Sequence, residues 1–135
     1  MRVFENFDAK KTQTLKLFGD DNLNNTYTFS YQNFNISSLL VENPENCFLI
    51  RVKGDSMIGA GIFNGDILLV DRSVLPKDNS IVVAEINSKL TVKKIKFEEN
   101  CITLHSENPN FLPIIVSRKD VFKIWGVVRS VIKTV

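Results

Sequence analysis

Short apolar segments separated by turn-forming residues run from residue 47 to the C-terminus, and this pattern most limits the fold that the chain can adopt. Segments of this length with alternating apolar positions are typical of strands. The predicted strands cover residues 47–52, 67–71, 80–86, 89–97, 101–105, 113–117 and 121–134. Short strands at close spacing with turn signals favour an antiparallel sheet. We therefore predict a mainly β fold, an antiparallel and partly closed sheet, with a short helix and an extended N-terminal arm.

Two connections in this region have the composition of hairpin turns. Asn87 and Ser88 form a tight turn between the predicted strands 80–86 and 89–97. The polar residues 98–100 form the next hairpin loop. These turns predict that strand 89–97 lies between two antiparallel neighbours.

The N-terminal part differs from the rest, because residues 1–25 are polar and irregular apart from the apolar-rich stretch 15–18. Tyr27, Phe29 and Tyr31 alternate with polar residues, which predicts one half-buried strand. This strand is either one more strand of the body or an arm strand that packs on the body or on a partner subunit. Asn35 can cap a short helix over residues 36–41. We place the domain boundary here, with an arm over residues 1–35 and a body over residues 36–135.

Composition limits the classes of protein to which the chain can belong. With 135 residues, 44% of them hydrophobic, it is long enough for one domain with a real core. A net charge of +2 is too small to indicate a nucleic-acid-binding protein. No apolar run approaches the length of a membrane span and the N-terminus is too polar for a signal peptide, so we predict a cytoplasmic protein without membrane contact.

Metal and cofactor sites are not predicted. No cluster of residues has the spacing of a zinc or calcium site, and no glycine-rich phosphate loop is present. The two cysteines, Cys47 and Cys101, each begin an apolar run, so we expect buried, reduced thiols.

The predicted strand 89–97 carries a lysine in an unusual position. Successive side chains of a strand point to opposite faces. One face of this strand carries Thr91, Lys93, Ile95 and Phe97, and the other carries Leu90, Val92, Lys94 and Lys96. Lys93 therefore lies among residues of an apolar face, where a solvated ammonium group is not expected. Lys94 shares its face with Lys96, so we expect that face to meet water and Lys94 to stay charged.

A serine on a glycine-bearing turn is the natural partner for such a lysine. Gly54 allows a sharp reversal after the apolar run 47–52, and this turn presents Ser56. A serine hydroxyl needs a neighbouring base to become a nucleophile. Burial favours the neutral form of lysine, which can be that base, and Ser-Lys pairs are a variant of the serine-histidine pair.

Each of these residues also has a simpler interpretation. Ser56 could only cap the short segment 57–60, and Lys94 is the rival base. The single histidine, His105, ends a strand and is better explained as a structural or surface residue. Asp66 and Asp71 flank an apolar strand and are typical of turn and cap residues.

Three motifs in order give the chain a resemblance to a known family. They are Gly-Asp-Ser-Met at residues 54–57, Gly-Asp before the apolar strand 67–71, and Thr-Val-Lys-Lys at residues 91–94. The chain resembles the LexA/UmuD family of self-cleaving serine peptidases over residues 36–135. The resemblance implies the fold of the family's C-terminal peptidase domain, with Ser56 as nucleophile, Lys93 as general base, and the backbone N–H groups of Asp55 and Ser56 as oxyanion donors.

The length of the chain is most similar to that of the UmuD-type members, which are accessory subunits of error-prone DNA polymerases. The resemblance then implies a homodimer, cleavage of the arm triggered by a RecA filament in the SOS response, and a Y-family polymerase as partner in translesion synthesis. The apolar run 121–128 is the predicted dimer contact. The residues before the body show neither helical periodicity nor a basic recognition helix, so we do not expect direct sequence-specific DNA binding.

The arm departs from the family pattern. Family members usually cleave an Ala-Gly or Cys-Gly bond, whereas the one glycine before Gly54 is Gly19, which follows Phe18. The cleaved bond is therefore Phe18–Gly19 with an enlarged pocket, or it lies elsewhere, or the chain does not cleave itself. The alternative functions are a non-cleaving interaction module of the same fold that binds a polymerase, and a peptidase that acts on another protein.

Overall fold

The computed structural model describes residues 12–15, 27–30 and 44–135. The chain divides into two units, Met1–Pro44 and Glu45–Val135, and each is described by itself. The predicted helix 36–41 with its cap at Asn35 lies outside the described residues, and so does the Phe18–Gly19 bond.

The first unit contains two short antiparallel strands, β1 (Thr12–Leu15) and β2 (Tyr27–Ser30). Their register pairs Thr12 with Ser30 and Leu15 with Tyr27. The strand predicted from the alternation at Tyr27 and Phe29 is confirmed, whereas β1 was not predicted. The boundary between arm and body at residue 35 stays a prediction.

The second unit contains one sheet of seven strands, as predicted. Each predicted strand is confirmed, and the observed ends differ from the predicted ends by no more than two residues. Two 3-10 turns, η2 (Pro44–Asn46) and η3 (Ile58–Ala60), complete this unit. The strands are β3 (Cys47–Arg51), β4 (Ile67–Asp71), β5 (Ile81–Ile86), β6 (Lys89–Phe97), β7 (Ile102–His105), β8 (Ile114–Val116) and β9 (Phe122–Ile132).

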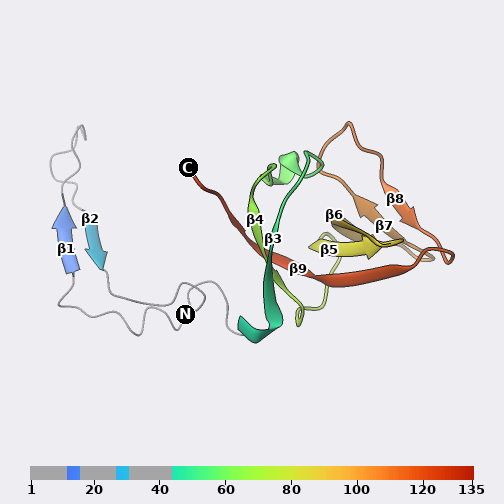
Figure 1. The fold of residues 1–135 in the computed structure, drawn as a ribbon, viewed down its shortest axis with the longest axis horizontal. Coiled ribbons are helices and arrows are strands. Elements are labelled where there is room, and N and C mark those ends of the chain that lie inside the picture. The colour runs from blue at the N-terminus through green and yellow to red at the C-terminus, as the bar shows by residue number, and fades with distance from the viewer. Residues whose placement is uncertain (1–11, 16–26, 31–43) are drawn as a thin grey trace. The chain divides into compact units, whose positions relative to one another are not determined.

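The strands of this sheet are all antiparallel to their neighbours, in the order β3-β4-β9-β5-β6-β7-β8 (Figure 1). The long strand β9 joins the two halves, because its C-terminal part pairs with β4 and its N-terminal part pairs with β5. The sheet is open, with β3 and β8 as its edges. The run 121–128 thus contributes to the centre of the sheet, and its contact with a second subunit stays a prediction.

The turn between β5 and β6 shows how local sequence sets the register. Asn87 and Ser88 both have left-handed backbone angles, with φ of 50° and 68°. Two such residues in succession are typical of the type I′ turn, whose twist matches that of a hairpin. The hairpin pairs Val82 with Lys93 and Ile86 with Lys89, which fixes the position of Lys93 in the sheet.

Both faces of the sheet are covered at its centre, because two apolar clusters lie on opposite sides of β5. The neighbours Val82 and Val83 are both fully buried but belong to different clusters, as the alternation of a strand requires. One cluster consists of Val52, Met57, Ile62, Leu68, Val70 and Val83. The other consists of Val82, Ala84, Ile95, Leu104 and Val127. The first cluster holds the residue after Ser56, and the second holds Ile95 on the face of Lys93.

Strand β9 is bulged on both sides of Gly126. Its register shifts opposite Leu69/Val70 and again opposite Val83/Ala84. Gly126 is so close to β4 that an added Cβ would lie 2.7 Å from the carbonyl oxygen of Asp71 and 2.8 Å from Cγ1 of Val70. Only glycine fits this contact between the two halves of the sheet.

We therefore expect Gly126→Ala to lower the free energy of unfolding by about 1–3 kcal/mol, because the new methyl group must displace backbone atoms. Urea denaturation followed by circular dichroism measures the change. Arg129→Ala, at an exposed position of the same strand, should stay within about 0.5 kcal/mol of the wild-type protein. Equal stability of Gly126→Ala and the wild-type protein would contradict the close contact.

Candidate active site

The turn that carries Ser56 leaves the sheet directly after β3. Pairing with the segment before β4 continues past the strand, since Val52 N–H donates to Asp66 O (2.8 Å) and Gly65 N–H donates to Val52 O (2.9 Å). The chain then reverses at Gly54, which has a φ of +92°, as predicted for a glycine at this turn. The N–H of Gly54 donates to Oδ1 of Asn64 (2.9 Å), which fixes the start of the turn.

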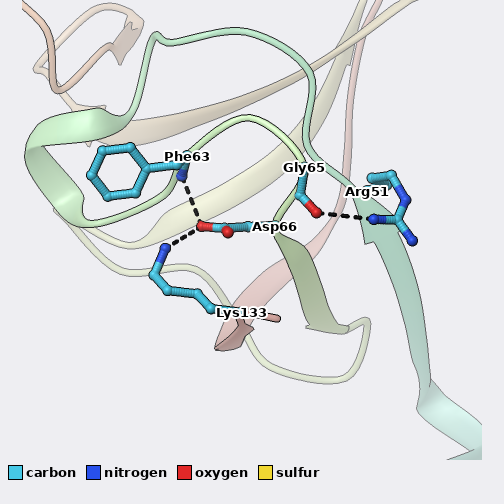
Figure 2. Close-up of polar contacts among 5 residues, drawn as sticks. All are labelled: Arg51, Phe63, Gly65, Asp66 and Lys133. Atoms are coloured by element: carbon cyan, nitrogen blue, oxygen red, sulfur yellow. Dashed lines mark hydrogen bonds and ion pairs between the residues drawn. The ribbon is translucent and has the colours of Figure 1, made fainter. Parts of the chain in front are cut away.

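The loop that contacts this turn is held by Asp66 (Figure 2). Oδ2 of Asp66 accepts the N–H of Phe63 (2.8 Å) and pairs with the ammonium group of Lys133, which also lies over the Phe63 ring. Beside it, Arg51 donates to the carbonyl oxygen of Gly65 (3.0 Å). The prediction that Asp66 is a turn residue is confirmed. The hydrogen bond from Lys133 is the main cause that holds the pKa of Asp66 below its ordinary value. Asp71 caps a turn in the same way, accepting the N–H of Ser73 (2.7 Å).

A second loop, between β7 and β8, holds the turn from another side. Glu107 N–H donates to Ser56 O (2.8 Å), and Gly59 N–H donates to Glu107 O (2.7 Å). Nδ2 of Asn108 donates to the carbonyl oxygen of Asp55 (2.9 Å). Sequence reasoning missed Glu107 and Asn108. The Asn-Pro pair at residues 108–109 marks a turn, but it does not show which segment this turn contacts.

Lys93 lies in β6 with its side chain buried, as the alternation predicted. It is 7% exposed, and Ile95 on the same face is fully buried. Its Nζ lies 2.9 Å from Oγ of Ser56 and 6.0 Å from the centre of the Phe111 ring. Burial lowers the pKa of Lys93 below its ordinary value, and among the residues that the structure describes no acidic partner opposes this effect. The structure thus brings the two predicted residues together and places the lysine where its neutral form is favoured.

Lys94, the rival base, points the other way. Its ammonium group pairs with the carboxylate of Glu107, and both side chains are about one-third exposed. The hydrogen bond from Lys94 holds the pKa of Glu107 below its ordinary value. Lys94 therefore acts as a charged partner on the half-exposed side of the strand, as expected for the face that it shares with Lys96.

A cleft of about 400 Å³ opens beside Ser56 and Lys93. Its walls come from the end of β3, the turn at Gly54, the start of β6 and the loop that carries Phe111. Most of the lining is apolar, including Ile50, Val52, Leu90, Val92 and Phe111. Leu90 is 61% exposed and Phe111 is 46% exposed, so both form an apolar rim. The volume and the mostly apolar lining are typical of a ligand-binding cleft.

The histidine and the two cysteines that the sequence analysis considered have ordinary structural roles. Nε2 of His105 lies 2.8 Å from Oγ1 of Thr103, its neighbour two residues earlier in β7. Cys47 and Cys101 are free thiols, as expected, but they are half-buried, whereas the sequence predicted that they are buried. Cys47 pairs with Asp71 across β3 and β4, and burial raises the pKa of its thiol.

None of the helical segments in the described ranges is long and apolar enough to cross a membrane.

Comparison with known proteins gives a family match over most of the chain. The family described as Peptidase S24-like matches residues 17–129. The LexA repressor of Caldicellulosiruptor saccharolyticus is 42% identical over 125 residues, which are 93% of this chain and 56% of that protein. The LexA repressor of Bordetella pertussis is 38% identical over 96 residues, which are 71% of this chain and 44% of that protein. The chain spans about half the length of these curated relatives. The names of these relatives support the predicted family. They do not support the prediction that the chain is a UmuD-type member of it.

The Asp66 ion pair gives a pH-dependent test of the loop that supports the turn. A carboxyl group whose pKa is lower in the folded state stabilises the fold above its unfolded value, 3.8, and loses this effect as the pH falls through the folded value. We expect Asp66→Asn to lower the free energy of unfolding at pH 7, and the difference from the wild-type protein to shrink below about pH 4. Urea denaturation across this pH range measures it.

Glu99→Gln, in an exposed loop, is the control for the loss of one carboxylate. A difference between Asp66→Asn and the wild-type protein that is the same at pH 7 and at pH 3 would show that the ion pair does not stabilise the loop.

Proposed function

We propose that this chain, which belongs to the S24-like peptidase family, is a serine peptidase that cleaves its own N-terminal arm. In this proposal Ser56 is the nucleophile and Lys93 is the general base. The observation that carries it is the 2.9 Å contact between Lys93 Nζ and Ser56 Oγ, made by a lysine that is 7% exposed. This contact lies at the end of an apolar cleft that can receive a peptide.

The reaction follows from the chemistry of these two groups. Neutral Lys93 accepts the proton of the Ser56 hydroxyl as Oγ attacks the carbonyl carbon of the scissile bond. The negative oxygen of the tetrahedral intermediate is stabilised by the N–H groups of Asp55 and Ser56. Protonated Lys93 then gives its proton to the leaving amine, and an ester to Ser56 remains. Neutral Lys93 next takes a proton from water as the water attacks the ester. The bond to Oγ then breaks, and Lys93 returns the proton to Oγ, so the carboxylic acid product leaves and free Ser56 is restored.

The substrate in this proposal is the arm of the same chain. The family resemblance supports self-cleavage in the SOS response with a RecA filament as trigger. Phe18–Gly19 is the candidate bond in the arm, and the apolar lining of the cleft supports an aromatic side chain beside Ser56. The absence of an Ala-Gly or Cys-Gly pair from the arm favours the second candidate, a non-cleaving module of the same fold that binds a polymerase.

The role of the protein after cleavage is a separate and more specific proposal. The motif resemblance favours a homodimer that serves a Y-family polymerase in translesion synthesis, as in the UmuD-type members. The curated relatives that match are instead named LexA repressors, and the chain spans about half of their length. Both assignments share the self-cleaving peptidase domain, so the chemistry at Ser56 is the part to test first.

We expect Ser56→Ala to abolish cleavage while the protein stays folded, because the nucleophilic oxygen is lost and only one small hydroxyl is removed. Mass spectrometry of the purified chain after incubation at alkaline pH measures cleavage and gives the scissile bond. Fragments that start at Gly19 would support the candidate bond. Cleavage of Ser56→Ala at the wild-type rate would overturn the assignment of the nucleophile.

The rate of self-cleavage should rise with pH until the lowered pKa of Lys93 is passed, because only the neutral amine can accept the serine proton. Lys93→Ala should lose the activity. Lys94→Ala should keep most of it, since the ion pair that it breaks is about one-third exposed and contributes little stability. The rates of the three proteins across the pH range are the measurement. A flat profile, or equal loss in both variants, would show that Lys93 is not the base.

A further inference from the structure

Asn108 is a buried polar residue that the proposed chemistry does not use. It is 8% exposed and lies in the loop between β7 and β8. Both ends of its carboxamide are occupied, because Nδ2 donates to Asp55 O (2.9 Å) and Oδ1 accepts the N–H of Asn110 (2.9 Å). A carboxamide held at both ends has a fixed orientation, and it fixes the group to which it donates.

The group that Asn108 fixes belongs to the peptide between Asp55 and Ser56. A trans peptide is planar, so its C=O and its N–H point in opposite directions. When Asn108 holds the carbonyl oxygen of Asp55 towards the loop, the N–H of Ser56 must point away from the loop. The next peptide is fixed in the same way, since Ser56 O accepts the N–H of Glu107.

In the proposed mechanism the N–H of Ser56 is one of the two donors that stabilise the oxyanion. Within the described part of the chain, neither this N–H nor that of Asp55 donates to an acceptor. The turn around them is constrained on both sides. Gly54 is bound to Asn64, and a Cβ on Gly59 would lie only 2.7 Å from the carbonyl oxygen of Glu107. The turn therefore has little freedom to reorient these donors except by rotation of the Asp55–Ser56 peptide. The carbonyl oxygen of this peptide accepts the short bond from Asn108 (2.9 Å) and a longer one from the N–H of Ile58 (3.4 Å).

We infer that Asn108 is a positioning residue, which aims the N–H of Ser56 at the oxyanion by holding the carbonyl of the same peptide. This inference rests on the proposed peptidase function. It predicts that loss of the Nδ2 donor lowers the rate of the chemical step while the Ser56–Lys93 contact remains. Removal of one oxyanion donor costs about 10²–10³ in rate, so a misaimed donor should cost about 10–100-fold.

Asn108 has a second contact that a test must separate from this role. Its backbone oxygen accepts the N–H of Phe111 (3.1 Å), and this turn brings the Phe111 ring near Lys93. A variant that loosened the turn would return water to Lys93 and change the pH dependence. Asn108→Asp retains an oxygen that can accept the N–H of Asn110 and loses the donor to Asp55. Asn110→Ala, at an exposed position of the same loop, is the matched control.

The test compares the plateau rate of self-cleavage, measured at pH values where the rate no longer rises. Asn108→Asp should lower this plateau by about 10–100-fold, whereas Asn110→Ala should leave it unchanged. Phe111→Ala, which exposes Lys93 to water, should instead shift the midpoint of the pH profile upward. A plateau in Asn108→Asp within twofold of wild type, or a shift of its midpoint alone, would overturn the inference.

A second measurement does not require cleavage. The backbone order parameter of the Ser56 N–H, from nitrogen-15 relaxation, should be about 0.85 in the wild-type protein and in Asn110→Ala, and should fall below about 0.6 in Asn108→Asp. An unchanged order parameter at Ser56 would overturn the inference. If the wild-type chain does not cleave at any pH, the proposed peptidase function fails, and the order parameter alone decides whether Asn108 positions this peptide.

Discussion

The site depends on one lysine being kept out of water. Lys93 is buried in the centre of a sheet strand, and its only hydrogen-bonding side-chain partner in the described residues is the Ser56 hydroxyl, at 2.9 Å. An ammonium group in such a place costs free energy, which the neutral amine avoids. The features that keep water away are structural: the fully buried Ile95 on the same face and the Phe111 ring beside the amine. The sheet therefore supplies the burial that lowers the pKa of Lys93.

Ser56 has a different requirement, which is orientation. Ser56 lies on a turn outside the strands, and two segments hold this turn: the loop 63–66, which contains Asn64 and Asp66, and residues 107–108 in the loop after β7. The partners are distant in sequence, since Lys93 is 37 residues from Ser56 and Asn108 is 53 residues from Asp55. The arrangement can form only when β3, β6 and the loop after β7 are all in place, so the site is a product of the complete sheet.

The part of this arrangement that depends on local rules was predictable from the sequence. Alternation along residues 89–97 placed Lys93 on the apolar face, and Gly54 marked the sharp turn that exposes Ser56. The Asn87-Ser88 turn and all seven strands of the sheet followed from similar local signals. The strand order, the central position of β9 and the contact of Asn108 with Asp55 were not predictable, because they depend on which distant segments meet. The apolar runs that begin at Cys47 and Cys101 predicted buried thiols, but both are only half-buried, because a run does not determine how its first residue is covered. A motif resemblance assigned the family correctly, but it could not choose between members that share the same catalytic domain.

The burial of Lys93 also couples the stability of the fold to the binding of a proton. In the unfolded chain this lysine binds its proton up to its ordinary pKa, 10.5, whereas the folded chain releases it at a lower pH. Between these two values the unfolded state holds more protons, so the stability of the fold increases as the pH rises. Below the folded value the full cost of the buried ammonium is present. The domain is thus less stable at neutral pH than its apolar core alone would make it. The residue that causes this loss of stability is the one that the proposed mechanism uses as the base.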